Sequence, residues 1–483
     1  MTMKTNRLYS FLLLLSAALG VSAESPKQEF RGAWLHTVYQ GQYKKQTTAQ
    51  NQAYLRNLLD SLQLTGVNAV IFQVRPQADA FYDSKLEPWS RFLTDDGAKP
   101  KPYWDPLQFM VEECHKRGME LHAWLNPYRV TTNAKQTLPK GHIYHKHPER
   151  FVRYDGKMYF NPGLPENREF IGKVVEDIVS RYDIDAIHFD DYFYPYPAKG
   201  KDFDDAAAFA KYGKGMARDD WRRHNVDLLI EELNTRIKKL KPWVRFGISP
   251  FGIWRNKTSD PRGSDTNGLQ NYDALYADVL LWEEKGWIDY LLPQLYWELD
   301  HKAASSRILA DWWDENSGHN RHLYIGQDVE RCISKGELGE KVEISRSRQN
   351  VAGNCWWPGY SVTRNSGGVA DSLANNLQKD IALVPPSSWL SSTPPAAPAK
   401  VSVEPGGVIA WQAPAPQGKI GDVTRFVIYR FDSPENIDVN DASAIIAVVP
   451  DMSFKTTEPG TYVVSALDRV NNESEPSVPV LIQ

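Results

Sequence analysis

The sequence predicts an α/β fold, a (β/α)₈ TIM barrel, followed by a small all-β sandwich. Eight short apolar runs alternate with longer stretches of helical periodicity over residues 27–384, and several short alternating runs follow a proline-rich segment near residue 390. Eight strands that alternate with helices describe a closed barrel better than an open doubly wound sheet. No G-x-G-x-x-G segment follows the first run, so the sequence gives dinucleotide binding no support.

The predicted barrel strands are rich in β-branched and aromatic residues, whereas the intervening stretches are amphipathic. The strands are predicted at residues 30–38, 67–74, 120–127, 184–190, 244–250, 288–296, 323–328 and 353–357. Helices are predicted, among others, at residues 50–64, 106–117, 166–182 and 220–240. Two connections, at about residues 128–165 and 192–220, are long. Because such barrels carry their function in the loops that follow the strands, we expect the site there.

A change of composition marks the end of the barrel. Residues 385–398 contain Pro-Pro, Ser-Ser and Pro-Pro-Ala-Ala-Pro, which is typical of a linker. Short alternating strands are predicted after it, at residues 408–411, 425–429, 444–449 and 461–466. Residues 399–483 are therefore predicted to form a β-sandwich, and RFVIYRF with PGTYVVSALDRVNNES resembles a fibronectin type III domain.

The first 23 residues have the pattern of a secretory signal peptide. Lys4 and Arg7 precede an apolar run over residues 8–19, and Val21-Ser22-Ala23 offers small residues at a cleavage site. No second apolar stretch approaches the length that crossing a bilayer requires. We therefore expect a secreted protein without a membrane span, either periplasmic or associated with the cell envelope.

Composition excludes several classes of function. The net charge of −4 and the absence of a basic run argue against nucleic acid as a partner. Cys114, Cys332 and Cys355 are too few for a disulfide framework and lack metal-ligand spacing, so no metal or organic cofactor is expected. Many of the 16 Trp and 23 Tyr residues lie near predicted strand ends, where aromatic rings can stack on the apolar faces of sugar rings.

The strongest chemical signal is a pair of acidic residues after the fourth predicted strand. IDAIHFDDYFYP places Asp190 and Asp191 at its end, directly before aromatic residues. Because side chains alternate along a strand, both carboxylates can face one pocket only if the chain bends there. Two carboxyl groups held close together among apolar rings raise at least one pKa, which suits a general acid.

The third predicted strand ends in a polar row. His122, Trp124 and Asn126 alternate with apolar residues and therefore share one face, and Tyr128 and Arg129 follow them. A polar row inside a barrel mouth costs free energy unless it binds a ligand or forms a network, so these residues are candidates for substrate binding.

Several other strand ends contribute weaker candidates. Each of these residues alone could have a structural role. They are candidates because they follow different strands that all end at the same mouth of the predicted barrel. These binding candidates are Arg75, Tyr192, Tyr194, Trp254, Gln294, Tyr296, Trp297, Glu298, Asp328 and Trp356.

The barrel sequence resembles the glycosyl hydrolase-like 10 family of exported bacterial barrel proteins. The resemblance rests on IHFDDYFYP and on the segments FRGAWLHTV, FQVRPQADAFYDSKLEPWS, HAWLNPYRV, GISPFGIWRN and PQLYWE. The resemblance covers about residues 29–390. It implies a (β/α)₈ barrel and glycosidase activity, with bacterial cell-wall glycan as the substrate suggested for some relatives. The positions that match the family motifs are Trp124, Asn126, Arg129, Asp190, Asp191, Tyr192, Gln294, Tyr296 and Trp297.

The fourth predicted strand is also similar to the acidic strand of the family 18 chitinases. Those enzymes carry their acidic Glu at the position where this sequence has Tyr192, so an acetamido-assisted mechanism would need one Asp as acid and another to orient the N-acetyl group. A two-carboxylate mechanism would instead need a partner on another strand. Asp79, Glu298 and Asp328 are the candidates for that partner.

These observations predict a glycoside hydrolase that acts outside the cytoplasm on a polysaccharide, with N-acetylhexosamine-containing peptidoglycan strands as one candidate. Asp191 is predicted as general acid/base, and Asp190 to orient it or to stabilise developing charge. Two alternatives remain open. The barrel could bind glycan without cleaving it, or Tyr192 with Arg75 or His122 could serve a lyase.

Overall fold

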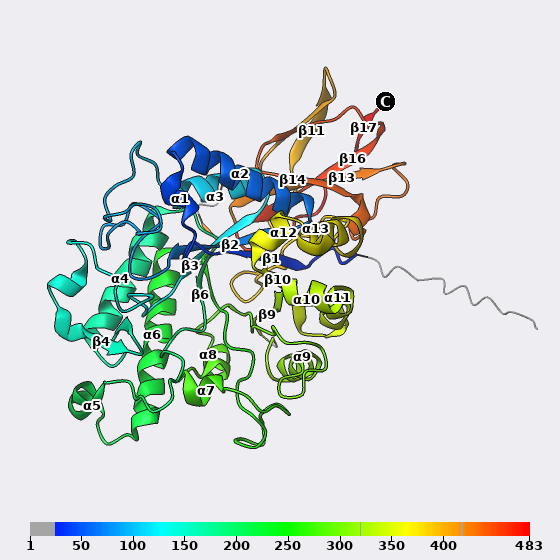
Figure 1. Ribbon diagram of the computed structural model, residues 1–483. Helices are drawn as coiled ribbons and strands as arrows, with labels where there is room; N and C mark the ends of the chain where they lie inside the picture. The colour runs from blue at the N-terminus through cyan, green and yellow to red at the C-terminus, as the bar shows by residue number, and fades with distance from the viewer. Residues whose placement is uncertain (1–24, 319, 417–418) are drawn as a thin grey trace, which may run out of the picture.

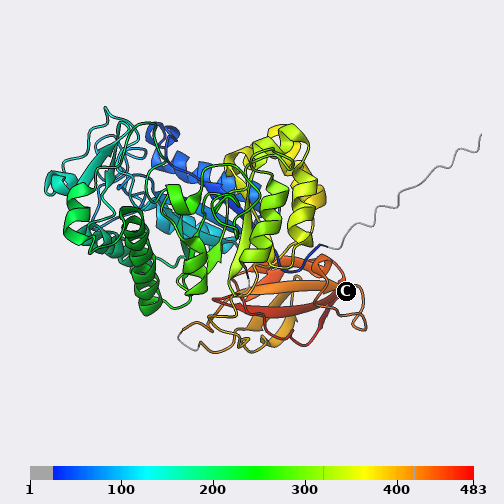
Figure 2. The same ribbon diagram turned by 90° about the horizontal axis from the view of Figure 1, so that it is seen from below.

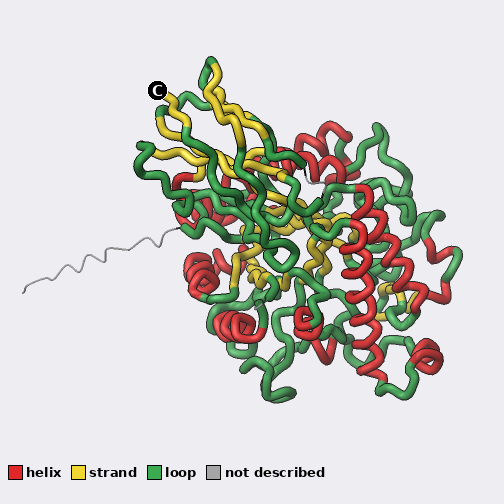
Figure 3. The backbone as a smooth tube through the Cα atoms, turned by 180° about the vertical axis from the view of Figure 1, so that it is seen from behind, coloured by secondary structure: helices red, strands yellow, loops and turns green. Residues whose placement is uncertain are grey.

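The computed structural model describes residues 25–318, 320–416 and 419–483. Within this part, eight parallel strands close into a barrel in the order β1, β10, β9, β8, β7, β6, β3, β2. Helices surround the strands, which the view from behind shows most plainly (Figures 1 and 3). Each predicted barrel strand contains or overlaps one of the eight, so the predicted fold class is confirmed. The predicted signal peptide, residues 1–23, lies outside the described residues.

The barrel elements that were predicted begin and end within about three residues of their predicted bounds, except β8, which has two residues where residues 288–296 were predicted. The strands are β1 (Phe30–Leu35), β2 (Ala69–Arg75), β3 (Glu120–Leu125), β6 (Ala186–Phe189), β7 (Arg245–Ile248), β8 (Tyr290–Leu291), β9 (His322–Asp328) and β10 (Val351–Trp357). The helices are α1 (Gln42–Lys45), α2 (Thr48–Leu64), α3 (Pro106–Lys116), α4 (Pro165–Arg181), α5 (Ala206–Tyr212), α6 (Arg218–Leu240), α7 (Asn271–Ala274), α8 (Val279–Glu284), α9 (Ser306–Asn316), α10 (Val329–Lys335), α11 (Leu338–Ser347), α12 (Gly359–Thr363) and α13 (Val369–Ser372). None of these helices combines the length and apolar character needed to cross a bilayer.

Bulky side chains fill the interior of the barrel below its mouth. Phe30 of β1 stacks on Tyr324 of β9 with ring centroids 3.9 Å apart, and Tyr290 of β8 lies beside both. Gly247 makes room for Tyr290, since a Cβ at Gly247 would come within 1.9 Å of that ring. The interior is therefore a packed core, and a ligand can enter only at the mouth.

Part of the connection at residues 128–165 is folded, although its sequence shows no clear strand pattern. It forms a hairpin of β4 (Phe151–Tyr154) and β5 (Lys157–Phe160). The N–H of Val130 donates to the carbonyl of Met158 at 2.9 Å, which fixes the start of the connection against the hairpin. This part of the connection is therefore an ordered hairpin that is hydrogen-bonded to the residues directly after β3.

The C-terminal residues form two antiparallel sheets in the part that the structure describes. One contains β11 (Ala399–Glu404), β12 (Val408–Gln412) and β15 (Ser453–Lys455); the other contains β14 (Ile445–Val449), β13 (Val423–Phe431), β16 (Gly460–Asp468) and β17 (Val480–Ile482). Trp411 of the first sheet packs on Phe426 of the second, so the sheets face each other across an apolar core. The resemblance to fibronectin type III remains a prediction.

The two-sheet module lies against the N-terminal ends of the barrel strands (Figure 2). Arg425 donates to the carbonyl of Gly118 at 3.3 Å and to the side chain of Asn471 at 2.5 Å. Asn471 in turn donates to Glu120, the first residue of β3, at 2.9 Å, and Glu120 also pairs with the buried Arg245 at 2.6 Å. The module therefore covers the end of the barrel opposite the mouth.

Candidate active site

A cavity of about 310 Å³ opens at the C-terminal mouth of the barrel. Side chains on the inward-facing side of seven barrel strands form it, together with residues of the first, third and fourth βα connections. The lining residues are Trp34, His36, Val38, Tyr39, Gln73, Trp124, Arg129, Asp190, Asp191, Tyr192, Tyr196, Ser249, Gln294, Tyr296 and Trp357. Among them only Asp190 and Asp191 carry carboxylates.

Asp190 is held by donors from β3 and from its own loop. Trp124 Nε1 donates to its Oδ2 at 3.0 Å, and Asn126 Nδ2 lies 3.2 and 3.3 Å from its two oxygens. The backbone N–H of Tyr192 donates to Oδ1 at 3.3 Å. Burial raises the pKa of Asp190 above its ordinary value, while the charge of Arg129 and these hydrogen bonds oppose the rise. The carboxylate is therefore fixed in one orientation.

Asp191 is 3% exposed and is the more strongly perturbed of the two carboxyl groups. Burial and, next, the neighbouring charge of Asp190 raise its pKa to about 7. The hydroxyl of Tyr196 donates to its Oδ2, and Gln294 also bonds to it. A carboxyl group with a pKa near 7 can hold a proton at neutral pH and still release it.

A bend explains how two consecutive residues reach the same cavity. Strand β6 ends at Phe189, and the backbone turns at Asp191. Alternation along the strand therefore no longer governs the second carboxylate. This is the bend on which the predicted pairing of Asp190 and Asp191 depended.

Aromatic side chains and one guanidinium form the rest of the wall. Tyr39 is 68% exposed and Tyr192 is 37% exposed, so both rings can meet a ligand. Trp124 and Trp357 meet nearly edge to face, with ring centroids 6.2 Å apart. Arg129 lies 5.2 Å over the ring of Tyr192, and its Nη2 donates to the carbonyl of Pro76 at 2.8 Å.

The structure brings together seven of the predicted site residues and places the others nearby or elsewhere. The seven that line the cavity are Trp124, Arg129, Asp190, Asp191, Tyr192, Gln294 and Tyr296. Asn126 lies directly behind the lining, where its Oδ1 accepts from the N–H of Arg129 at 2.9 Å while its amide group donates to Asp190. Asn126 therefore orients two lining residues.

Five predicted binding residues are buried away from the cavity. Arg75 forms a two-pronged ion pair with the buried Glu87, at 2.6 and 2.7 Å, because the register of β2 shifts just before it. His122 faces the barrel interior below the mouth, bonded to Glu120 and Tyr290. The remaining three are packed among other aromatic or apolar side chains: Tyr128, Tyr194 and Trp254.

Four more predicted residues lie outside the cavity. Trp356 is 1% exposed in the core between strands and helices, because Cys355 faces the barrel interior and alternation turns Trp357 to the mouth instead. Trp297 packs on Phe251 with ring centroids 5.3 Å apart. The other two, Glu298 and Asp328, are acidic and also lie outside the cavity.

None of the three candidates for a second carboxylate lines the cavity. Glu298 pairs with Lys335 at 3.5 Å, and Asp328 accepts from the N–H of Arg331 at 3.0 Å as the N-cap of α10. Asp79 accepts from Ser90 at 2.8 Å in a buried turn. Among the described residues no group of three His, Cys, Asp or Glu side chains is arranged to hold a metal ion.

The sequence pattern does not identify the lining residues of the first strand and its loop. Trp34, His36 and Tyr39 line the cavity, yet nothing in their local pattern distinguishes them from core aromatics. The parity of β1 could have identified Trp34. Tyr196 was missed although it follows the acidic pair by only five residues.

Comparisons with known proteins agree with this architecture. Residues 29–339 match the model of the family described as Glycosyl hydrolase-like 10. Glycosyl hydrolase YngK of Bacillus subtilis (strain 168) is 39% identical over 489 residues, which cover 96% of this chain and 95% of that protein. Glycosyl hydrolase DigH of Escherichia coli (strain K12) is 40% identical over 329 residues, which cover 63% of this chain and 74% of that protein.

One solved structure supports the fold alone. The glycoside hydrolase domain of PgaB (BpsB) from Bordetella bronchiseptica aligns with a TM-score of 0.50 at 12% identity, over 72% of this chain and 98% of that domain. The family match spans more than half of the chain, and the Bacillus relative is similar over nearly all of it. This chain therefore belongs to the glycosyl hydrolase-like 10 family.

Proposed function

We propose that this protein is a glycoside hydrolase that cleaves the N-acetylhexosamine-containing glycan strands of peptidoglycan, with Asp191 as the general acid/base. The observation that carries the proposal is the adjacent pair Asp190 and Asp191, the sole carboxylates among the residues that line an aromatic cavity. Membership of a hydrolase-like family and the names of two relatives support the reaction class.

Asp191 has the properties that protonation of a leaving oxygen requires. Burial and the charge of Asp190 raise its pKa to about 7, so at neutral pH a large fraction of the carboxyl groups is protonated. Its proton passes to the glycosidic oxygen as the bond between that oxygen and the anomeric carbon breaks. The resulting carboxylate then accepts a proton from the water that completes hydrolysis.

The absence of a third lining carboxylate favours assistance by the substrate. The acetamido oxygen of the sugar would attack the anomeric carbon and form a cyclic intermediate, which water reopens. Asp190 would accept a hydrogen bond from the acetamido N–H and stabilise its developing positive charge. The fixed orientation of Asp190 by Trp124 and Asn126 supports this role.

The proposal includes a location outside the cytoplasm, in the cell envelope. It rests on the signal-peptide pattern of residues 1–23. Detection of the protein in periplasmic and envelope fractions, with the mature N-terminus determined by mass spectrometry, tests this part separately.

The activity is tested by product analysis. The purified protein, its Asp191→Asn variant and a Glu298→Gln control are incubated with intact peptidoglycan, with peptidoglycan stripped of its peptides, and with a panel of plant and animal glycans. Mass spectrometry then identifies any released sugars. We expect products from the parent and from Glu298→Gln but not from Asp191→Asn, because Glu298 lies outside the cavity.

A thiazoline analogue of the cyclic intermediate tests substrate assistance and should inhibit cleavage competitively. If the protein cleaves the glycan but the analogue does not inhibit it, the protein is a hydrolase whose nucleophile is not the acetamido group. Glycan binding without release of any sugar by the parent would instead establish the barrel as a binding protein. An ultraviolet-absorbing product would identify a lyase.

A further inference from the structure

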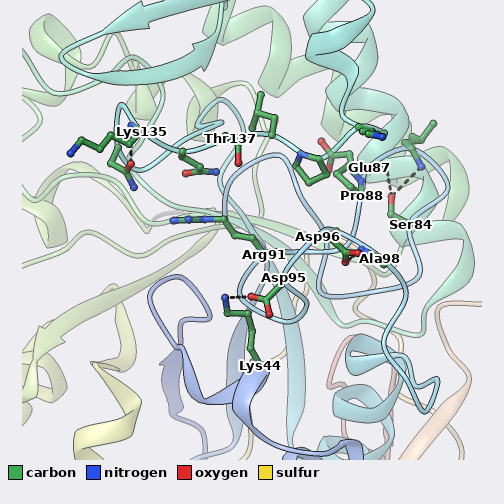
Figure 4. A pocket seen from close by; sticks show the side chains of 18 of the residues that line it. Lys44, Ser84, Glu87, Pro88, Arg91, Asp95, Asp96, Ala98, Lys135 and Thr137 are labelled. Carbon is green, nitrogen blue, oxygen red and sulfur yellow. Dashed lines mark hydrogen bonds and ion pairs between the residues drawn. The ribbon is translucent and has the colours of Figure 1, made fainter.

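A second and larger cavity, of about 1060 Å³, lies on the same face of the barrel as the catalytic cavity. Its walls come from α1 and from the connections after β2 and β3, all of which lie at the C-terminal mouth. Figure 4 shows Arg91 between the loop that carries Lys135 and Thr137 and the pair formed by Lys44 and Asp95. The proposed reaction does not use this cavity.

The lining of this cavity carries an excess of positive charge. Five cationic side chains, Lys44, Lys85, Arg91, Lys135 and Lys140, face three carboxylates, Glu87, Asp95 and Asp96. Two of these carboxylates are engaged elsewhere or neutralised locally. Glu87 pairs with the buried Arg75, Asp95 pairs with Lys44 at 2.5 Å, and Lys85 lies 3.7 Å from Asp83. Among the described residues, Arg91, Lys135 and Lys140 are therefore the lining cations without a carboxylate partner.

The cations Lys135 and Lys140 are exposed and form no ion pair with any residue that the structure describes. Both belong to the connection after β3, which begins at the catalytic cavity with Arg129. Unpaired lysines at the rim of a concave surface attract anions, although each contributes little alone.

Arg91 gives the cavity a fixed donor. Its guanidinium lies 4.7 Å over the ring of Phe92, and Nη2 donates to Thr132 Oγ1 at 3.0 Å. Its Nε is buried, without a hydrogen-bond partner among the described residues, and lies out of reach of a ligand. Nη1 makes no hydrogen bond with the described residues, so a guanidinium held in place in this way can offer it to a carboxylate.

The second cavity adjoins the catalytic cavity through an aromatic contact. Phe92, on which Arg91 lies, meets Tyr39 with ring centroids 6.0 Å apart. Tyr39 lines the catalytic cavity and has a φ of 64°, unfavourable for a residue with a side chain. Tyr39 therefore connects the catalytic cavity, through Phe92, to Arg91 of the second cavity.

We propose that this cationic cavity is a subsite for a carboxylate carried by the glycan chain, at a sugar beyond the bond that is cleaved. Arg91 binds the carboxylate directly, Lys135 and Lys140 supply positive potential, and Tyr39 supports the intervening sugar. The inference rests on the proposed function for the identity of the chain, but its binding test does not require cleavage.

Binding is measured by isothermal titration calorimetry in the Asp191→Asn background, so that no ligand is consumed. The probes are peptide-free cell-wall oligosaccharides whose lactyl ethers carry carboxylates, and the same oligosaccharides with those carboxyl groups reduced to alcohols. We expect the reduced form to bind about tenfold more weakly, the effect of losing one charge-assisted contact.

Two variants test whether the named residues cause this preference. Arg91→Gln and the double variant Lys135→Gln/Lys140→Gln should bind the acidic form several-fold more weakly and leave binding of the reduced form unchanged. Because both lysines are exposed, the double variant should fold normally even if Arg91→Gln does not. Lys239→Gln/Lys285→Gln is the matched control, since it removes two charges near the C-terminal ends of α6 and α8, at the opposite end of the barrel.

The subsite would be overturned if the two oligosaccharides bound equally well, or if neither bound. A preference for the acidic form that survives in both variants or is lost equally in the control would also overturn it. Hydrolysis by the parent is recorded with the same two oligosaccharides. A preference for the carboxylate form without cleavage would refute the proposed function but support the subsite. Cleavage without such a preference would support the proposed function but refute the subsite.

Discussion

The indole N–H of Trp34, in the wall of the cavity that holds Asp190 and Asp191, donates to Nε2 of His188 at 3.3 Å. This bond fixes the proton on the other ring nitrogen, so Nδ1 of His188 donates to the hydroxyl of Tyr290 at 2.9 Å. Tyr290 then donates to Nδ1 of His122 at 2.8 Å, and Nε2 of His122 donates to Glu120 at 3.1 Å. A directed chain of hydrogen bonds thus runs along the barrel axis.

Burial supports this assignment of protons, because it lowers the pKa of both His188 and His122 and keeps both rings neutral. The chain ends at Glu120, which also accepts from Asn471 of the C-terminal module. The mouth and the module therefore share one polar network inside an apolar barrel. Such a network stabilises the fold only when every member has a partner.

Replacement of Tyr290 by Phe should destabilise the protein. The substitution keeps the ring but leaves the donor of His188 and the acceptor of His122 without partners in a buried site. We expect a loss of about 2–4 kcal/mol in the free energy of unfolding, measured by denaturant titration. Tyr103→Phe, at a position that is 54% exposed, should change it by less than about 0.5 kcal/mol. Equal effects of the two substitutions would show that the chain contributes nothing.

Replacement of Arg425 by Met should also destabilise the barrel, although the residue belongs to the C-terminal module. Arg425 is buried and contacts Gly118 and Asn471, so its loss leaves buried acceptors unpaired. We expect a loss of about 2–4 kcal/mol in the same titration. Arg430→Met, in the same strand but partly exposed, should cost under about 1 kcal/mol. An unchanged stability of Arg425→Met would mean that the module is a passive appendage.

The sequence predicts the barrel well because its strands repeat one simple pattern. Runs that are buried on both faces are continuously apolar, and each observed barrel strand lies in or overlaps a predicted run. The hairpin of β4 and β5 escapes prediction because its strands are short and pair only with each other. Docking of the module beneath the barrel is also not predictable, since Arg425 and Asn471 resemble ordinary surface residues of a sandwich.

Site residues are predictable where the alternation of side chains along a strand and their order in the chain determine which way they face. They are not predictable where contacts with distant residues determine it. Asp190 and Asp191 are identifiable because two acids end an apolar strand. Arg75 shares their placement at a strand end, but its ion pair with Glu87 turns it into the core. The choice between Trp356 and Trp357 depends on the register of β10, which a run of three consecutive apolar residues does not reveal.

Substitution of Asp191 by Asn should stabilise the protein above about pH 4. The folded-state pKa of about 7 exceeds the ordinary value of 3.8, so the folded protein keeps a proton that the unfolded chain has lost. Stability conferred by the carboxylic acid therefore falls as the pH rises from about 4 to 7, by at most about 4 kcal/mol. The variant lacks this penalty, and thermal unfolding should show its greatest advantage over the parent near pH 8.

The same comparison near pH 4 should show little difference between Asp191→Asn and the parent. Asp300→Asn, at a side chain that is 85% exposed, is the control and should leave stability unchanged at both pH values. A stabilisation by Asp191→Asn that is equal at pH 4 and pH 8 would mean that the effect is not electrostatic.

Substitution of Asp190 by Asn should move the pH profile of the proposed hydrolysis. The negative charge of Asp190 is, after burial, the largest cause of the raised pKa of Asp191. Without that charge the pKa of Asp191 falls, so the acid loses its proton at a lower pH and the alkaline limb of kcat/KM shifts to lower pH. The parent should show this limb near pH 7, and Glu298→Gln should leave it in place because Glu298 lies outside the cavity. A limb that stays near pH 7 in Asp190→Asn would assign the acid to a group other than Asp191.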